Sequence, residues 1–311
     1  MIWIIGAGLI GQEYAKILTS LGQEFIIIGR GEESAAKCEE VVSHSVIRGG
    51  LKSFLLSNPE PASKAIVAVR TPDLANVTIM LMNYGIKTIL CEKPGFRAPD
   101  ELDIVLKVMK RNNANVFLAY NRRFYSSTLK AEDIIKEDGG VTSFNFEFTE
   151  WPDRIAAAGY DNSILNYWFY ANSTHVVDLA FFLGGFPVDM KCYTASRIAW
   201  HEPSVFAGAG VTDKGALFSY EANWDAPGRW AIEILTRKHR LYFKPMETLQ
   251  IQEMYSVKVN PLEIDDHLDK DFKPGFYLET KAFLEGNTSR LCTLDQQVKN
   301  VYDFYMKILN H

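Results

Sequence analysis

The glycine-rich stretch near the N-terminus constrains the fold of this chain most. Residues 2–11 read IWIIGAGLIG, a short apolar run followed by GxGxxG and by the start of an amphipathic helical pattern. Glycines in this order permit a tight turn, close approach of a pyrophosphate and close packing of a helix on a strand, and the helix N-terminus offers N–H groups to an anion. The stretch therefore predicts a dinucleotide site, with a purely structural turn as the alternative. The predicted cofactor-binding residues here are Gly6, Gly8, Leu9, Ile10 and Gly11.

Short apolar runs alternate with helical periodicity over residues 1–120. Runs with the length and β-branching of buried strands lie at 2–5, 25–28, 65–69, 88–90 and 116–119. Strand–helix alternation of this kind is typical of a doubly wound parallel sheet. We therefore predict an α/β chain with an N-terminal Rossmann domain that binds NAD(P) over residues 1–120.

The pattern changes near Tyr120. Phe144, Phe146 and Phe148 alternate with polar residues, which is the period of a half-buried strand. Further strands are predicted at 190–198, 205–211, 216–224, 230–236 and 240–244, with turns at 212–215 and 237–239. We predict a C-terminal α+β domain over residues 121–311. It would contain a large, mostly antiparallel open sheet with a helix near 174–183 on one face.

The end of the second predicted strand bears on the choice of cofactor. An acid about 20 residues beyond the glycines would hold the ribose 2′-hydroxyl of NAD. Here the strand ends in Gly29 and Arg30, and a guanidinium suits the 2′-phosphate of NADP. The alternative is that Arg30 is a solvated loop charge and that Glu32 or Glu33 holds the ribose of NAD. We predict NADP, with NAD as the alternative.

Residues 89–96, ILCEKPGF, end an apolar run in an acid, an amine and a proline. A ligand of an open parallel sheet lies beyond the carboxyl ends of its strands. A positive charge at such a strand end stabilises an alkoxide that forms as hydride leaves, or polarises a carbonyl in the reverse direction. We predict a catalytic role for Lys93 and a cis Lys93–Pro94 bond. The alternative is a surface ion pair between Lys93 and Glu92.

A second group of polar residues lies at the start of the helix predicted near 174–183. His175 and Asp178 are three residues apart and can therefore touch on one helix face. A carboxylate beside an imidazole holds its orientation and stabilises the imidazolium. We predict both as catalytic residues and place Asn172, just before the helix, among the substrate-binding residues. The alternative is a His–Asp pair that packs the helix against the sheet.

Four motifs in this order resemble the glucose–fructose oxidoreductase/inositol dehydrogenase (Gfo/Idh/MocA) family. They are GAGLIG at 6–11, RTPD at 70–73, CEKP at 91–94 and YNRRF at 120–124. In the second half, THVVDL at 174–179 is similar to the family's His-x-x-Asp segment, and GFYLETKAFLEG at 275–286 looks like its late helix. The resemblance therefore spans nearly the whole chain.

The resemblance implies hydride transfer between a nicotinamide and a hydroxyl carbon of a sugar, a cyclitol or a nucleotide-linked sugar. It implies that Arg70, Thr71 and Pro72 contact the cofactor, that Glu92 lies near the nicotinamide ribose, that Lys93 is catalytic, and that His175 faces the reacting hydroxyl. The chain departs from the family where Ala171 replaces a common acid, where Ser173 replaces a glycine, and where Asn76 and Val77 stand in place of a histidine.

Three further residues are predicted to bind substrate. Asn121 and Arg122 follow the last strand of the first domain, where they would contact nicotinamide or substrate, or form a salt bridge at the domain boundary. Trp151 ends a strand and, in the family pattern, faces the helix of the second domain. Its indole would stack on a sugar ring, although aromatic residues more often fill cores.

Composition limits the partners. A net charge of −5 and a pI near 5.8 argue against nucleic acid and acidic membranes as partners. No apolar run approaches the length of a membrane span. The four cysteines show neither metal-ligand spacing nor a CxxC pair, so we predict reduced thiols, no metal and a cytoplasmic location. Residues 205–211 offer little polar surface on either face, which predicts a homodimer or homotetramer formed through the open sheet.

The sequence therefore predicts an NADP- or NAD-dependent oxidoreductase that acts on a carbohydrate-like alcohol or carbonyl. The alternative is a non-catalytic dinucleotide-binding sensor or regulatory protein on the same fold. Ala171 favours this alternative, whereas Lys93 and His175 favour the enzyme.

Overall fold

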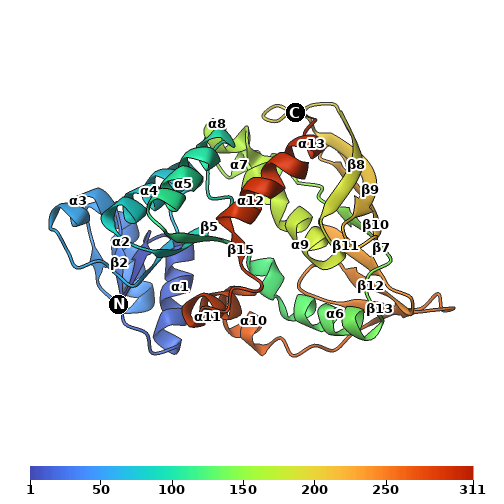
Figure 1. Ribbon diagram of the computed structural model, residues 1–311, viewed down its shortest axis with the longest axis horizontal. Coiled ribbons are helices and arrows are strands. Elements are labelled where there is room, and N and C mark those ends of the chain that lie inside the picture. Colours follow the sequence, from blue (N-terminus) through green and yellow to red (C-terminus); the bar gives the residue numbers. More distant parts are fainter. Residues whose placement is uncertain (311) are drawn as a thin grey trace. The chain divides into compact units, whose positions relative to one another are not determined.

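The computed structural model describes residues 1–310 and divides them into two compact units (Figure 1). The first unit comprises Met1–Asn121 and Asp271–Val298, and the second comprises Arg122–Lys270 and the chain from Lys299 onward. The division after Asn121 lies one residue from the one predicted. The structure differs in returning residues 271–298 to the first unit, because a helix and a short strand in this segment pack there.

The sheet of the first unit runs, within the described residues, in the order β15-β6-β5-β4-β1-β2-β3. Its strands are β1 (Ile2–Ile5), β2 (Phe25–Ile28), β3 (Val46–Ile47), β4 (Lys64–Val67), β5 (Thr88–Glu92), β6 (Asn115–Ala119) and β15 (Cys292–Thr293). All neighbours are parallel except β15, which pairs antiparallel with β6. The predicted Rossmann sheet is confirmed. The two-residue strands β3 and β15 were not predicted, because so short a run carries no periodicity.

Helices connect these strands. They are α1 (Leu9–Ser20), α2 (Glu32–Val42), α3 (Gly50–Leu56), the 3-10 turn η1 (Thr71–Asp73), α4 (Leu74–Tyr84), α5 (Asp100–Arg111), α11 (Phe276–Glu285) and the start of α12 (Leu294–Asn300). The late helix α11 packs against α1, where the rings of Phe276 and Tyr14 lie 5.1 Å apart. Lys64 Nζ donates hydrogen bonds to the carbonyl oxygens of Phe283 and Leu284 at the end of α11. These contacts hold residues 276–285 in the first unit.

The second unit contains a larger sheet, which runs in the order β14-β13-β12-β11-β7-β10-β9-β8 within the described residues. Its strands are β7 (Ser143–Glu147), β8 (Pro187–Ala195), β9 (Val205–Thr212), β10 (Leu217–Asn223), β11 (Ala231–Leu235), β12 (His239–Phe243), β13 (Gln250–Glu253) and β14 (Val259–Pro261). Only the β7–β10 pair is parallel among these described neighbours. The prediction of a large, mostly antiparallel sheet is confirmed.

One face of this sheet is covered by α9 (Thr174–Gly184), as predicted. Phe181 on the helix meets Phe144, Phe146 and Phe218 on the sheet, with ring centroids 5.0–5.9 Å apart in edge-to-face geometry. Such aromatic pairs add about 0.5–1.5 kcal/mol each beyond their burial. The remaining helices are α6 (Ser126–Glu137), α7 (Pro152–Ala157), α8 (Asn162–Leu165), α10 (His267–Asp271) and α13 (Met306–Ile308), with helical turns η2 (Asn121–Phe124), η3 (Phe169–Ser173) and η4 (Val301–Tyr305).

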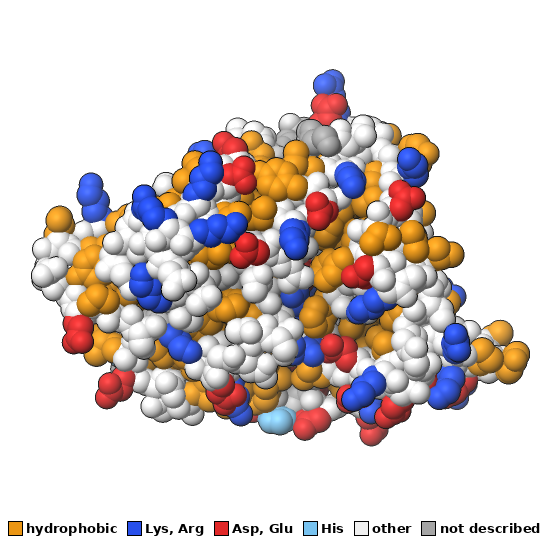
Figure 2. Space-filling view, in the orientation of Figure 1, with side chains coloured by type: hydrophobic (Ala, Val, Ile, Leu, Met, Phe, Trp, Pro, Cys, Tyr) orange, Lys and Arg blue, Asp and Glu red, His pale blue; other side chains and the backbone are white. Residues whose placement is uncertain are grey.

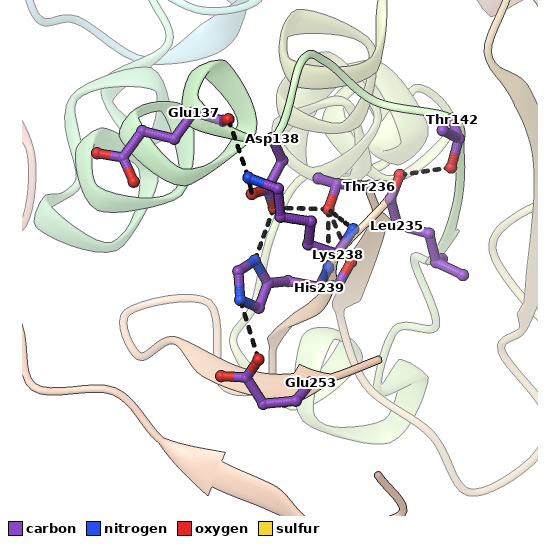
Figure 3. A network of polar contacts seen from close by, with 8 residues as sticks. All are labelled: Glu137, Asp138, Thr142, Leu235, Thr236, Lys238, His239 and Glu253. Carbon is purple, nitrogen blue, oxygen red and sulfur yellow. Dashed lines mark hydrogen bonds and ion pairs between the residues drawn. The ribbon is translucent and has the colours of Figure 1, made fainter. Parts of the chain in front are cut away.

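A polar network ties the turn between β11 and β12 to the end of α6 (Figure 3). The carboxylate of Asp138 accepts hydrogen bonds from Thr236 Oγ1 and pairs with His239 Nδ1, each at 2.7 Å, and Lys238 Nζ lies 3.5 Å away. Burial raises the pKa of Asp138, but the hydrogen bonds from Thr236 and His239 outweigh it and lower that pKa. The network fixes the turn between β11 and β12.

The other face of the sheet exposes apolar side chains. Val188, Tyr193 and Leu217 on β8 and β10 are more than 60% exposed. At the tip of the β13–β14 hairpin, Tyr255 and Val257 are almost fully exposed, and apolar atoms dominate this tip in Figure 2. Elsewhere on the face shown in Figure 2, acidic and basic side chains are interspersed. No helix formed by residues 1–310 has both the length and the apolar character that a membrane span requires.

Candidate functional site

The glycine turn joins β1 to α1 at the carboxyl edge of the first sheet, as predicted. Gly6 has a φ of +121°, and a Cβ there would lie 2.2 Å from the carbonyl oxygen of Ala68. A Cβ on Gly11 would lie 1.9 Å from the carbonyl oxygen of Gly6. Both glycines are therefore required by the protein's own packing, the first for the turn and the third for the close approach of helix to strand.

Gly8 differs from both of these glycines. Its φ of −78° and ψ of −178° are extended, and a Cβ built there meets no atom within 4 Å. Nothing in the fold demands glycine here, yet the open space lies at the N-cap of α1. The first N–H groups of this helix, from Leu9, Ile10 and Gly11, have no intrahelical acceptor. The space beside them fits a pyrophosphate, which bare backbone can approach closely.

A cavity of about 650 Å³ begins at this turn. It is lined by the glycine turn and by the ends of β2 and β4, and includes the basic residues Arg30, Lys52 and Arg70. Asp73 lies between two of them, with its carboxylate 3.5 Å from Arg30 and 3.7 Å from Arg70. The part of the cavity beyond β2 is therefore positive, and its size suits one half of a dinucleotide.

Gly29 explains why no acid ends β2. A Cβ there would lie 2.9 Å from Val46 and 3.0 Å from Ala7, so a longer side chain would displace the β3 strand or the glycine turn. The two acids considered as alternatives are engaged elsewhere. Glu32 pairs with Arg48 at 2.7 Å, and Glu33 pairs with Lys37 at 2.9 Å.

The RTPD segment also borders the cavity. Arg70 and Asp73 line the cavity, together with Asn76 and Val77 from α4. Asn76 and Val77 are the positions at which the sequence departs from the histidine of the family pattern. Thr71 and Pro72 form the 3-10 turn η1 between Arg70 and Asp73. The structure thus places the whole predicted segment beside the cavity.

Glu92 and Lys93 stand at the end of β5, one strand beyond β4 in the sheet. The hydroxyl of Tyr14 donates a hydrogen bond of 2.9 Å to Glu92, and burial together with the Glu92 charge raises the pKa of Tyr14 well above its usual value. Lys93 is only 9% exposed, and the Lys93–Pro94 bond is cis, as predicted. A lysine this buried does not fit the alternative of a surface ion pair.

In the second unit, polar side chains gather where β7 ends and β11 begins. These strands are antiparallel neighbours, with Glu147 opposite Ala231, so residues after β7 lie beside residues before β11. Glu150 is 1% exposed there, and its carboxylate accepts hydrogen bonds from Ser173 Oγ (2.8 Å), Asn172 Nδ2 (3.0 Å) and Arg229 Nη1 (3.2 Å). Burial raises the pKa of Glu150, and these donors oppose the rise.

Around Glu150 lies a set of residues that we call the arginine–tryptophan cluster: Arg122, Trp151, Arg154, Arg229 and Trp230. The Arg229 guanidinium lies 4.5 Å from the ring centre of Trp151 and 4.4 Å from that of Trp230. Arg122 lies 4.9 Å from the ring of Trp230, and Arg154 lies 4.7 Å from that of Trp151. Cation–π contacts of this kind hold guanidinium groups in place at a modest gain in energy.

His175 joins this cluster. Its imidazole lies 6.3 Å from the ring of Trp230, on the first turn of α9, and the preceding residues Asn172 and Ser173 are bound by Glu150. Four of the predicted substrate-binding residues are therefore neighbours in the second unit: Arg122, Trp151, Asn172 and His175. Asn121 lies in the first unit, where its side-chain amide donates a hydrogen bond of 2.9 Å to the carbonyl oxygen of Pro274.

Asp178 has a different environment from the one predicted. Its two carboxylate oxygens accept hydrogen bonds from Arg123 Nε (2.8 Å) and Nη2 (2.6 Å), and both side chains are at most 2% exposed. A bidentate, buried pair of this kind anchors α9 to the segment that follows β6. The geometry favours the alternative in which Asp178 holds α9 in place by packing. The acid that positions the residues before His175 is Glu150.

Sequence reasoning missed Glu150, Arg229, Trp230 and Arg123. A signal for Glu150 was present, because it continues the buried positions 144, 146 and 148 in a strand whose inward face should be apolar. Trp230 likewise precedes the buried Ile232 and Ile234 in register. No signal links residue 150 to residue 229, because their proximity depends on which strands pair.

Comparison with known proteins agrees with this geometry. Residues 1–120 match the Gfo/Idh/MocA family, described as an oxidoreductase family with an NAD-binding Rossmann fold. No curated protein sequence matches the chain.

Solved structures share the fold over nearly the whole chain. A levoglucosan dehydrogenase in complex with NADH is 17% identical, with a TM-score of 0.75 over 99% of this chain and 95% of that chain. The UDP-N-acetylglucosamine 3-dehydrogenase GnnA from Acidithiobacillus ferrooxidans is 14% identical, with a TM-score of 0.73 over 99% and 96%. A dehydrogenase, WlbA, from a Chromobacterium in complex with NADH and UDP-GlcNAcA is 15% identical, with a TM-score of 0.71 over 99% and 93%.

At these identities the solved structures establish the fold. Residues 1–120, which contain the glycine turn and line its cavity, match the NAD-binding Rossmann fold of the Gfo/Idh/MocA oxidoreductase family.

Proposed function

We propose that this protein is an NAD(P)-dependent oxidoreductase that transfers hydride between the nicotinamide and a hydroxyl or keto carbon of a sugar, a cyclitol or a nucleotide-linked sugar. The observation that carries the proposal is the glycine turn, where Gly8 leaves open space at the N-terminus of α1 above the cavity. The family match of residues 1–120 and the similarity of the fold to solved dehydrogenases support the same activity.

The proposed work of the residues follows from their positions. Backbone N–H groups of residues 9–11 would hold the pyrophosphate of a bound cofactor, whose nicotinamide would supply the hydride chemistry. Lys93 places a positive charge at the end of β5, where it stabilises the alkoxide form of the reacting oxygen. His175, on a turn held by Glu150, is the proposed partner for the proton of the reacting hydroxyl.

We propose NADP as the preferred cofactor. Arg30 and Lys52 line the cavity beyond β2, whereas Glu32 and Glu33 are paired with Arg48 and Lys37. A 2′-phosphate carries charge and acceptor oxygens that a guanidinium binds well. Asp73 lies 3.5 Å from Arg30 and limits the gain, so NAD stays the alternative.

We also propose a cytoplasmic homo-oligomer that forms through the outer face of the second sheet. Exposed Val188, Tyr193 and Leu217 supply apolar surface on that face, and the hairpin tip with Tyr255 and Val257 supplies more. Cys38, Cys91, Cys192 and Cys292 are free thiols, which fits a reducing compartment. Light scattering at micromolar concentration tests the oligomer, and a monomer would contradict it.

The activity is tested by mixing the protein with NADP or NAD and following the absorbance of reduced nicotinamide across three substrate classes. These are free sugars, cyclitols and nucleotide-linked sugars. Cofactor reduction with a member of any class is the expected result. Calorimetric titration of the cofactor alone is measured in parallel. Cofactor binding without turnover of any class would favour the sensor alternative, to which Ala171 points.

A further inference from the structure

Gln297 is a buried polar residue to which the proposed function gives no role. It lies on α12 with 0% of its surface exposed, and Leu294, one turn earlier on the same face of the helix, is likewise buried. Burial of an amide costs free energy unless its groups are hydrogen-bonded. A glutamine on the buried face of a helix therefore points to a specific partner.

The two groups of the Gln297 amide meet the ends of two neighbouring strands of the first sheet. Its Nε2 donates a hydrogen bond of 3.0 Å to the carbonyl oxygen of Pro94, beyond the end of β5, and its Oε1 accepts one of 3.1 Å from the hydroxyl of Tyr120, beyond the end of β6. A carbonyl oxygen only accepts, so the NH2 group must face Pro94 and the amide oxygen must face the hydroxyl. The amide thus has one orientation in which both of its groups are bonded.

The short strand β15 brings Gln297 to this place. Cys292 pairs with Leu118 on β6, the strand beside β5, and α12 begins at Leu294, directly after β15. The turn that Gln297 binds is packed against the same strand β6, because a Cβ on Gly95 would lie 2.5 Å from Leu118 Cδ1. The hydrogen bond from Gln297 adds a fixed direction to this close packing.

We propose that Gln297 is a positioning residue for Lys93, which it holds through the carbonyl of Pro94. The inference rests on the proposed function and assigns a further residue to it. Lys93 is 9% exposed and directly precedes Pro94, so the backbone from which its side chain extends belongs to the turn that Gln297 binds. A catalytic group that is misplaced by about 1 Å loses up to about a hundredfold in rate. Gln297 therefore affects the reaction through the placement of Lys93.

The competing explanation gives Gln297 a structural role only, in which it satisfies a buried carbonyl. Gln297→Met is close to glutamine in size and forms neither hydrogen bond, so it distinguishes the two explanations. A structural role predicts a lower melting temperature with Lys93 unchanged. A positioning role predicts, in addition, a displaced Lys93 and a turnover per folded molecule that is about 10- to 100-fold slower.

The first measurement needs no substrate. The titration of Lys93 is followed by carbon-13 NMR of its Cε in the protein alone, and the signal is assigned by its absence in Lys93→Met. The midpoint depends on the distances from the amine to neighbouring charges, so we expect it to move by about 0.5 pH units or more in Gln297→Met. The control is Gln296→Met, the same substitution at a more exposed position of α12, where we expect a change below about 0.1 pH units.

The second measurement is a pH profile of turnover with the substrate class that the activity screen identifies. Gln297→Glu places a carboxyl group where the amide was. When it is protonated, its O–H donates to the carbonyl oxygen of Pro94, whereas its carboxylate repels that oxygen. Burial raises the pKa of the introduced carboxyl above about 4.3, so turnover relative to the parent should rise about tenfold or more as the pH falls from about 8 to about 5.5. The same ratio for Gln297→Met should change less than about threefold.

An unchanged Lys93 midpoint in folded Gln297→Met, or parental turnover in that variant, would overturn the inference. If Gln297→Met does not fold, Tyr120→Phe replaces it, because it removes the hydroxyl that orients the amide; a shift of at least about 0.3 pH units is then expected, and no shift would overturn the inference. A shifted midpoint without turnover of any substrate class would keep the positioning role and contradict the proposed function. Turnover by the parent with an unshifted midpoint would do the reverse.

Discussion

The two candidate sites of this protein are built from different parts of the chain. In the first unit, the turn at residues 6–11 presents backbone, and glycine is required because side chains would block either the fold or the ligand. In the second unit, side chains from four separate segments meet around Glu150. A backbone site tolerates change in neighbouring side chains but not added bulk. A side-chain site is sensitive to the replacement of its side chains and less sensitive to bulk added elsewhere.

The largest effect is expected for Lys93→Met. Loss of a group that acts on the reacting oxygen typically slows turnover about a hundred- to ten-thousand-fold. Cofactor affinity should stay within about twofold of the parent, because the pyrophosphate is held by backbone N–H groups. Steady-state turnover and calorimetric titration of the cofactor separate the two. If turnover stays within a few-fold of the parent, Lys93 has no catalytic role.

Asp178→Asn is expected to act on stability. It leaves the Arg123 guanidinium buried without its carboxylate partner, which costs about 3–5 kcal/mol of unfolding free energy. The measurement is denaturant unfolding, with Asp133→Asn, the same change at an exposed position of α6, as the control. Turnover per folded molecule should be unchanged. A large loss of turnover with unchanged stability would restore the catalytic role first predicted for Asp178.

Arg30→Ala is expected to lower NADP affinity about 10- to 100-fold, because a charge-assisted contact to the 2′-phosphate is lost. NAD affinity, which has no such contact, serves as the internal control and should hardly change. Titration of both cofactors against both proteins provides the measurement. Equal loss of NAD and NADP binding, or loss of neither, would argue for NAD as the natural cofactor.

The smallest effect concerns Glu39, which does not line the cavity of the first site. Hydrogen bonds from Arg48 lower the pKa of Glu39 from 4.5 to about 2. A lowered pKa contributes stability above the unfolded-state value, and this contribution is lost as the pH falls through the folded-state value. Glu39→Gln should therefore lower the melting temperature slightly at pH 7, and the difference from the parent should vanish between about pH 4.5 and pH 2. A difference that persists in acid would assign it to packing.

The sequence allowed most of the first site to be predicted and only part of the second. GAGLIG and CEKP are local patterns, and the physical demands behind them, a tight turn and a charge at a strand end, act within a few residues. Glu150 and Arg229 are 79 residues apart, and they meet because β7 pairs with β11. Strand pairing depends on the whole sheet. The ion pair of Asp178 with Arg123, in place of the predicted contact with His175, likewise depends on packing between segments that are distant in the sequence.

The contrast between the backbone site of the first unit and the side-chain site of the second is tested most directly by titrating NADP against Gly8→Val and Arg229→Gln. A Cβ at position 8 meets no protein atom within 4 Å and the backbone there is extended, so we expect Gly8→Val to keep the melting temperature of the parent while its side chain fills the space proposed for the pyrophosphate. NADP affinity should fall at least about a hundredfold in Gly8→Val, the loss of two or more charge-assisted hydrogen bonds, and should not change in Arg229→Gln. A folded Gly8→Val protein that binds NADP as tightly as the parent would contradict the account.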